Sequence, residues 1–212
     1  TPDYSSAASD VYKRQVYGKT KNPYDLTRTC GGSSGGAAVA LATRMLSISD
    51  GSDMMGSLRN PAAWNNVYGL RPTWGLVPPE PSGEIFLSQL STLGPMARSP
   101  KDLALLLDVQ ANHFDNKSYV AQSKSFSNFT AQPRMKNIKI GWLGDWGGTL
   151  TFEDELLDLA QNALNEMSSL GATIHDLKAP FAMNDIWTSW CDLRAWQITN
   201  GLRDISVSYT HL

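Results

Sequence analysis

The sequence is poor in the residues that mark disulfide-rich, metal-binding or membrane-spanning proteins. It has two cysteines and three histidines in 212 residues, and Cys30 and Cys191 lie far apart in the chain. Free thiols are therefore expected, as in a reducing compartment, and the cytoplasm is the expected location. No Cys/His cluster has the spacing of metal ligands. No apolar run approaches the roughly 20 residues that a membrane-spanning helix needs.

An excess of charge of one sign is also missing. The chain has 18 Lys and Arg against 20 Asp and Glu, which gives a formal net charge of -2. A balance this close to neutral argues against nucleic acid as the main partner. Hydrophobic residues make up 42% and charged residues 18%, as in globular chains. The length suits one domain or a large part of one.

Both ends of the chain read as translated DNA adaptor. Asp10–Gln15 can be encoded by GAT GTG TAT AAG AGA CAG, and the reverse complement of that string encodes the sequence of Val207–Leu212. Ser5–Ser9 fits the upstream half of a transposase-type sequencing adaptor. We therefore leave residues 1–15 and 206–212 out of the functional reasoning. We expect residues 16–205 to be a partial domain that lacks its N-terminal and C-terminal parts.

Local patterns predict a mixture of helices and strands. The apolar run of small residues at 37–46 predicts a buried helix, which is followed by a tight loop at Gly51–Arg59 and a short helix from Pro61. Ser99 precedes a proline and, three residues later, an acid, which predicts a helix capped by this serine.

The second half of the chain predicts a β-α-β unit. Strands are expected at Ile138–Leu143 and Ala172–Leu177, with a helix between them that is capped at Thr151–Asp154 and ends at Gly171. The tryptophans after this unit, Trp187, Trp190 and Trp196, are interpreted as core or pocket wall.

The residues with chemical potential gather in two glycine-rich loops, Gly31–Gly36 and Asp53–Arg59. Glycines let a substrate approach the backbone closely, and successive N–H groups near a helix start can bind an oxyanion. The loops contain three candidate nucleophiles, Ser33, Ser34 and Ser57. A serine needs a neighbouring base to act as a nucleophile.

One possible arrangement is the G-x-S-x-G elbow of α/β-hydrolases, which Gly31–Gly35 satisfies. An elbow requires a strand before it, and Thr27–Cys30 does not have the pattern of a buried strand. It also requires a histidine and an acid. The candidate histidines are His113 and His175, and Asp176 beside His175 is expected to point to the opposite face of the strand. A phosphate cradle is a weaker possibility, because the Gly-Lys-Ser/Thr ending is absent.

The two loops and their spacing resemble the amidase signature family, the Ser-cis-Ser-Lys amide hydrolases. The motif in this sequence is GGSSGG, then a linking helix, then DMMGSLRNP. The resemblance continues through GLRPTWGLVP and TLGPMARSPKDLALLLDV. It implies an α/β fold with a mixed central sheet flanked by helices, hydrolysis of a small-molecule carboxylic amide, and no cofactor.

The resemblance also implies roles for individual residues. Ser57 matches the nucleophile, and Ser33 matches the bridging serine, which follows a cis peptide bond from Gly32. The remaining roles are the oxyanion hole, formed by the backbone N–H groups of Met54, Met55, Gly56 and Ser57, and support of the loops by Asp53, Arg59 and Ser34. Met55 replaces a residue that is usually small, which should reshape the acyl side of the pocket.

The third member of the triad is a neutral lysine that acts as the base and lies well before the glycine-rich loop in the family. Lys19 and Lys21 are too close to Ser33, and Lys13 belongs to the suspected adaptor. The base is therefore expected outside this sequence, and the fragment itself is expected to be inactive. Two other functions stay open: the amidotransferase subunit that forms glutaminyl-tRNA, and a binding module without catalytic activity.

Overall fold

The computed structural model describes residues 18–78, 87–112, 125–128, 135–153 and 155–201. The segments interpreted as adaptor lie outside these residues, and so does His113. The chain divides into two compact units, residues 1–129 with 200–212, and residues 130–199. Each unit is described by itself.

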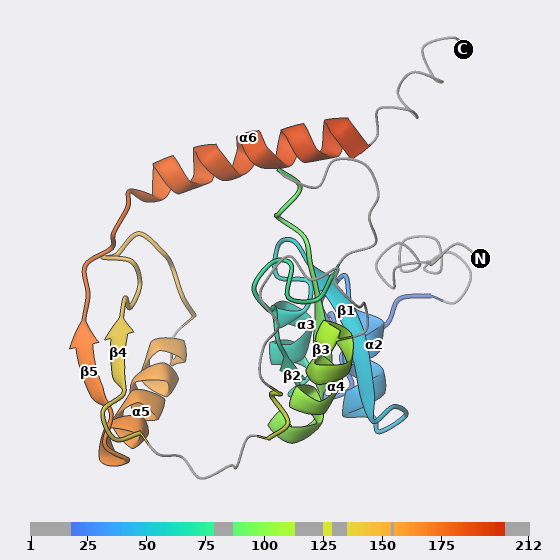
Figure 1. Ribbon diagram of the computed structural model, residues 1–212, viewed down its shortest axis with the longest axis horizontal. Coiled ribbons are helices and arrows are strands. Elements are labelled where there is room, and N and C mark those ends of the chain that lie inside the picture. The colour runs from blue at the N-terminus through green and yellow to red at the C-terminus, as the bar shows by residue number, and fades with distance from the viewer. Residues whose placement is uncertain (1–17, 79–86, 113–124, 129–134, 154, 202–212) are drawn as a thin grey trace. The chain divides into compact units, whose positions relative to one another are not determined.

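The first unit is built on a three-stranded antiparallel sheet in the order β1-β3-β2. Asp53 at the end of β1 pairs with Thr92 at the start of β3. Helices α2, α3 and α4 contact β1, β2 and β3, respectively, and Figure 1 shows them gathered around the sheet. The elements are α2 (Gly35–Ala42), β1 (Ile48–Asp53), α3 (Arg59–Trp64), β2 (Tyr68–Gly69), β3 (Thr92–Ala97) and α4 (Pro100–Asn112).

The hydrophobic core of this unit lies directly behind the two serine loops. It consists of Ala38 and Leu41 from α2, Leu58, Ala62 from α3 and Met96 from β3, all of them buried. Leu58 follows Ser57 in the chain, so burial of the Leu58 side chain fixes the end of the second loop to the core.

Several local predictions for this unit are confirmed. The Ser99 hydroxyl accepts a hydrogen bond from the Asp102 N–H over 3.1 Å and donates one to the Asp102 carboxylate over 2.7 Å. This reciprocal arrangement caps α4 at its N-terminus. The short helix predicted at Pro61 is α3.

Two local predictions for the first unit are wrong in extent. Gly51–Asp53 belong to β1 and not to a loop, because they pair with Thr92–Gly94 of β3. The helix predicted to reach residue 46 ends at Ala42. The Thr43 hydroxyl donates to the Val39 carbonyl over 2.7 Å, and Arg44 turns the chain with a φ of 63°.

The second unit contains the predicted β-α-β arrangement. Strands β4 (Lys139–Trp142) and β5 (Thr173–Asp176) pair in parallel, and α5 (Leu156–Ser169) connects them and contacts β5. Gly171 follows α5 with a φ of 103°, as expected for a helix end. The predicted cap at Thr151 is wrong, because Glu155 is the N-cap residue and its side chain makes no capping hydrogen bond.

The fold class is α/β, as predicted. Both pairing directions expected of a mixed sheet occur among the described residues, the antiparallel one in the first unit and the parallel one in the second.

Helix α6 (Met183–Gly201) carries the tryptophans. None of its described residues is buried, and Trp187 is 61% exposed. Of the two interpretations, core or pocket wall, core is therefore wrong for the part of the chain that the structure describes. Trp187 instead stacks on Trp190 with ring centroids 5.3 Å apart, and the Arg194 guanidinium lies 5.4 Å from the centre of the Trp190 ring. No helix in the described ranges is both long and apolar enough to span a membrane.

Candidate active site

The first serine loop connects the segment before Cys30 to α2. The Gly32–Ser33 peptide bond is cis, as expected from the sequence. Ser33 is half-buried and Ser34 is buried. Between residues 18 and 34 the only pairing of β type is an isolated bridge from Lys21 to Thr29. The strand that a nucleophile elbow requires is therefore absent from this segment.

The second serine loop, Met54–Leu58, connects β1 to α3. Gly56 is buried and has a φ of 97°, a conformation that favours glycine. Ser57 is half-buried, whereas the Met55 side chain is 53% exposed. The loop thus presents Met55 outward beside the candidate nucleophile.

The structure brings the two loops together. The Ser34 N–H donates to the Ser57 carbonyl oxygen over 3.2 Å. The residue after Ser33 is therefore hydrogen-bonded directly to Ser57. Among the described residues there is no hydrogen bond between the Ser33 and Ser57 hydroxyls, and their contact stays a prediction.

Asp53 organises the second loop from inside. Its carboxylate is fully buried and accepts hydrogen bonds from the N–H groups of Gly56, Leu58 and Arg59 over 2.7, 3.2 and 3.3 Å. The Arg59 guanidinium adds two more, from Nε over 2.9 Å and from Nη2 over 3.0 Å.

These contacts determine the charge state of Asp53. Burial acts to raise the pKa of its carboxyl group, but the hydrogen bonds from the Arg59 side chain and the Gly56 N–H outweigh it. The pKa falls to about 2. At neutral pH Asp53 is therefore an anion around which the loop folds. The supporting role expected for Asp53 and Arg59 stays a prediction.

The four N–H groups expected to form the oxyanion hole differ in their hydrogen bonds, and their role stays a prediction. The Gly56 N–H donates to Asp53 Oδ1 over 2.7 Å and is thus engaged in holding the loop. The N–H groups of Met54, Met55 and Ser57 make no hydrogen bond to another described residue. These three groups remain available for an oxyanion.

Ser34, in the first loop, has a buried hydroxyl group without a hydrogen-bond partner among the described residues. A Cβ on Gly51 would come within 2.5 Å of Ser34 Oγ and 2.8 Å of Leu58 Cδ2. Strand β1 thus needs glycine at position 51, where it passes under the first loop.

Sequence reasoning missed two residues that hold the site together. Arg71 donates from Nε to the Asp53 carbonyl oxygen over 3.3 Å and from Nη2 to the Leu90 carbonyl over 3.0 Å. Asn65, just after α3, is fully buried and donates to the Cys30 and Pro61 carbonyls. The sequence around Arg71 and Asn65 is typical of loops and does not indicate these long-range contacts.

The candidate bases in the described chain are all exposed. Every lysine in the described ranges is exposed to solvent, including Lys19 and Lys21. His175 is also exposed, on β5 of the second unit. Both cysteines are free thiols, as predicted.

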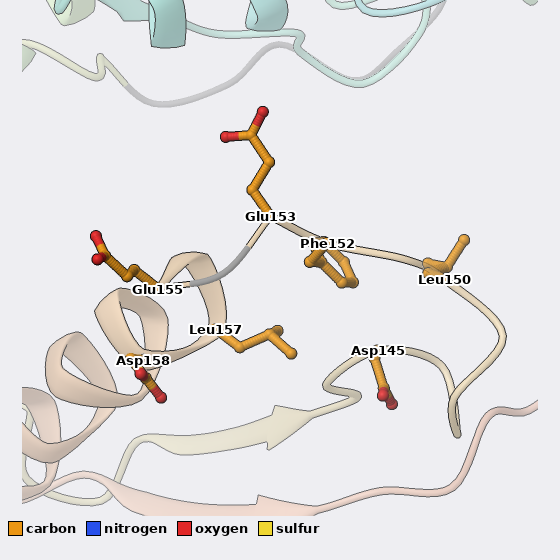
Figure 2. Close-up of a pocket in the computed structure, with 7 residues that line it drawn as sticks. All are labelled: Asp145, Leu150, Phe152, Glu153, Glu155, Leu157 and Asp158. Atoms are coloured by element: carbon orange, nitrogen blue, oxygen red, sulfur yellow. The ribbon is translucent and has the colours of Figure 1, made fainter.

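A separate pocket of about 210 Å³ lies in the second unit. Figure 2 shows Phe152 and Leu157 at its centre, whereas the carboxylates of Glu153, Glu155 and Asp158 point in different directions. Converging ligands are needed for a cation, and no group of acidic, histidine or cysteine side chains in the described residues could hold a metal ion. None of the predicted site residues lines this pocket.

Comparisons with known proteins agree with this arrangement of loops. A family model described as Amidase matches residues 5–196. A glutamyl-tRNA(Gln) amidotransferase subunit of Pseudomonas aeruginosa is 37% identical over 167 residues, which cover 77% of this chain and 34% of that protein. The chain thus spans about a third of the length of the curated relatives it matches.

Solved structures give the same result. The crystal structure of a bacterial aryl acylamidase of the amidase signature family matches with a TM-score of 0.79 and 28% identity, over 90% of this chain and 39% of that one. The structure of 6-aminohexanoate cyclic dimer hydrolase complexed with substrate matches with a TM-score of 0.66 and 28% identity, over 74% of this chain and 34% of that one.

Proposed function

This chain belongs to the amidase family, and on that premise we propose that its parent protein hydrolyses a carboxylic amide through an acyl-enzyme on Ser57. The observation that carries the proposal is the junction of the two loops. The hydrogen bond from the Ser34 N–H to the Ser57 carbonyl brings the candidate bridging serine and the candidate nucleophile to one place. The arrangement needs no cofactor.

In the proposed reaction, the Ser57 hydroxyl oxygen attacks the amide carbonyl carbon while Ser33 accepts the Ser57 proton and passes its own to the base. The carbonyl oxygen becomes an oxyanion, which the N–H groups of Met54, Met55 and Ser57 stabilise. Preorganised donors of this kind act strongly because they are already in place when the charge develops. The amine leaves with a proton, and water then hydrolyses the ester on Ser57.

Asp53 and Arg59 support this reaction without touching the substrate. The buried carboxylate draws the Gly56, Leu58 and Arg59 N–H groups inward. The loop therefore curves around Asp53, which leaves the N–H groups on its other side for the oxyanion.

The base is proposed to be a lysine outside the described residues. A lysine base must be kept neutral by burial and by its neighbours. Because every described lysine is exposed, none of them meets this requirement.

The test is to recover the complete reading frame around this sequence and assay the purified protein with a panel of carboxylic amides. The proposal predicts turnover that is abolished by Ser57→Ala. Normal turnover by Ser57→Ala, or none by the wild-type protein on any amide, would contradict it.

The amidotransferase alternative rests on the names of relatives at 37% identity. It predicts that glutamine is the preferred amide and that hydrolysis rises when partner proteins are present. Comparing glutamine with the rest of the panel, with and without the products of the neighbouring genes, separates the two functions. A binding module would bind an amide without turning it over.

A further inference from the structure

We propose that Asn65 is a positioning residue that couples the two serine loops and so keeps Ser33 and Ser57 in register. This inference rests on the proposed function. It concerns a side chain that lies outside both glycine-rich loops and acts through the backbone on each side of the site.

The first observation is the pair of hydrogen bonds made by the Asn65 amide. Its Nδ2 donates to the Cys30 carbonyl and to the Pro61 carbonyl, each over 2.7 Å. Cys30 lies three residues before Ser33, and Pro61 lies in α3, the helix that begins two residues after Ser57. One buried amide thus joins the segment just before Ser33 to the helix just after Ser57.

The second observation is the close packing at the same junction. Gly31 has a φ of 78°, and a Cβ there would lie 2.9 Å from the Trp64 ring and 3.3 Å from Pro61 Cα. The backbone just before the cis peptide bond therefore rests on the surface of α3. Two hydrogen bonds link the same two segments: the one from the Asn65 amide to the Cys30 carbonyl, and the one from the Ser34 N–H to the Ser57 carbonyl.

The two bonds of Asn65 have different consequences. The bond to Pro61 spans four residues and only completes the end of α3, which the Asn65 N–H also does by donating to the Pro61 carbonyl over 3.1 Å. The bond to Cys30 spans 35 residues and is the one that links the loops. If Asn65 were only a helix cap, loss of the bond to Cys30 would leave the loops unchanged.

The Asn65→Ser variant separates these possibilities. A serine hydroxyl in or next to a helix can bond to the carbonyl four residues earlier, so it can keep the bond to Pro61. It is too short to replace the amide at Cys30. Asn65→Asp is a stronger second variant, since its carboxylate oxygens would face two carbonyl oxygens. The matched controls are Asn66→Asp, a change at the exposed neighbouring asparagine, and Leu164→Ala, which removes a buried side chain in α5.

The first measurement is amide hydrogen exchange of the 212-residue chain by NMR, read at the Ser34 N–H. We expect exchange at Ser34 to become at least about tenfold faster in Asn65→Ser, because local opening of the junction exposes this amide. Exchange of the core amides of Leu41 and Met96 should stay within about twofold, and neither control variant should affect Ser34. Unchanged exchange at Ser34, or an equal increase at Ser34, Leu41 and Met96, would overturn the proposal. If Asn65→Asp does not fold, Asn65→Ser still decides.

The second measurement uses the restored full-length protein. Misplacement of reacting groups by about 1 Å can lower a rate by roughly 100-fold. We therefore expect Asn65→Ser to lower kcat by about ten- to a hundredfold, with KM changed less than about twofold. An unchanged kcat would overturn the positioning role. If the wild-type protein turns over no amide, the proposed function fails, and the exchange measurement alone then decides whether Asn65 couples the loops.

Discussion

Asp53 and Arg59, which flank the second serine loop, form a bidentate ion pair, with Arg59 Nε 2.9 Å from Asp53 Oδ2 and Nη2 3.0 Å from Oδ1. The carboxylate is fully buried, whereas the arginine side chain is 57% exposed. The pair thus connects the interior of the loop to its surface. The same carboxylate binds three backbone N–H groups, so the loop depends on Asp53 more than on any other side chain described in it.

The first prediction concerns the loss of this anion. Asp53→Asn replaces charge-assisted hydrogen bonds with neutral ones and turns an NH2 group toward N–H donors. We expect it to lower the free energy of unfolding by about 1.5–3 kcal/mol, the range for hydrogen bonds to charged groups. Urea denaturation measures the change. The control is Asp50→Asn, at an exposed position of the same strand, and a loss as large in this control would contradict the assignment.

The second prediction follows from the lowered pKa of Asp53, which is about 2 in the folded chain. An unfolded aspartate has a pKa of about 3.9, so the folded chain holds its proton more weakly. The stabilisation by Asp53 is therefore fully present above about pH 4 and is lost as the pH falls through about 2. Denaturation of the wild type and of Asp53→Asn across this range should show their difference shrink toward acid. A difference that grew below pH 4 would contradict the sign.

The third prediction compares two glycines. In Gly51→Ala the new methyl group would meet Ser34 Oγ and Leu58 Cδ2, both closer than 3 Å, and we expect a loss of roughly 1–3 kcal/mol from overpacking. A Cβ on Gly36 in α2 would meet nothing within 4 Å. Gly36→Ala should therefore stabilise the chain by about 0.5–1 kcal/mol. Thermal unfolding of both variants is the measurement, and the same direction of change in both would contradict the packing described for β1.

The fourth prediction concerns Leu58, the core residue next to the candidate nucleophile. Leu58→Ala leaves a cavity beneath the second loop and should cost about 2–5 kcal/mol of stability. Leu159→Ala, on the exposed face of α5, removes the same atoms from a side chain that is 68% exposed and should have a small effect. Chemical denaturation of both variants tests this, and similar losses in the two would count against Leu58 as the anchor of the loop.

Local signals carried much of the fold prediction. Ser99 followed by proline and aspartate predicted the start of α4, and the spacing of apolar residues predicted the β-α-β unit. Both signals depend on residues that are close together in the sequence. Strand β3 was missed, since its sequence TLGPMA contains glycine and proline, which are depleted in strands. Gly94 is nevertheless required there, as a Cβ would collide with the Leu70 carbonyl oxygen.

The site was predictable only where its chemistry is local. The motif predicted the cis peptide bond, which the structure contains. It also named Ser33 and Ser57 as candidates and suggested that Asp53 and Arg59 hold the loop. It could not show that the Gly56 N–H serves Asp53, since that depends on how the loop curves in space. The roles of Asn65 and Arg71 were also missed, because their contacts reach 35 and 18 residues along the chain.

The central claim is that Ser57 is the nucleophile, and covalent labelling tests it most directly. The restored full-length protein is treated with a serine-reactive fluorophosphonate, and the labelled peptide is identified by mass spectrometry. The account predicts a single adduct on Ser57, absent from Ser57→Ala and also from the 212-residue chain, in which every described lysine is exposed. An adduct on Ser33 or Ser34 in the wild-type protein, or labelling that persists in Ser57→Ala, would contradict it.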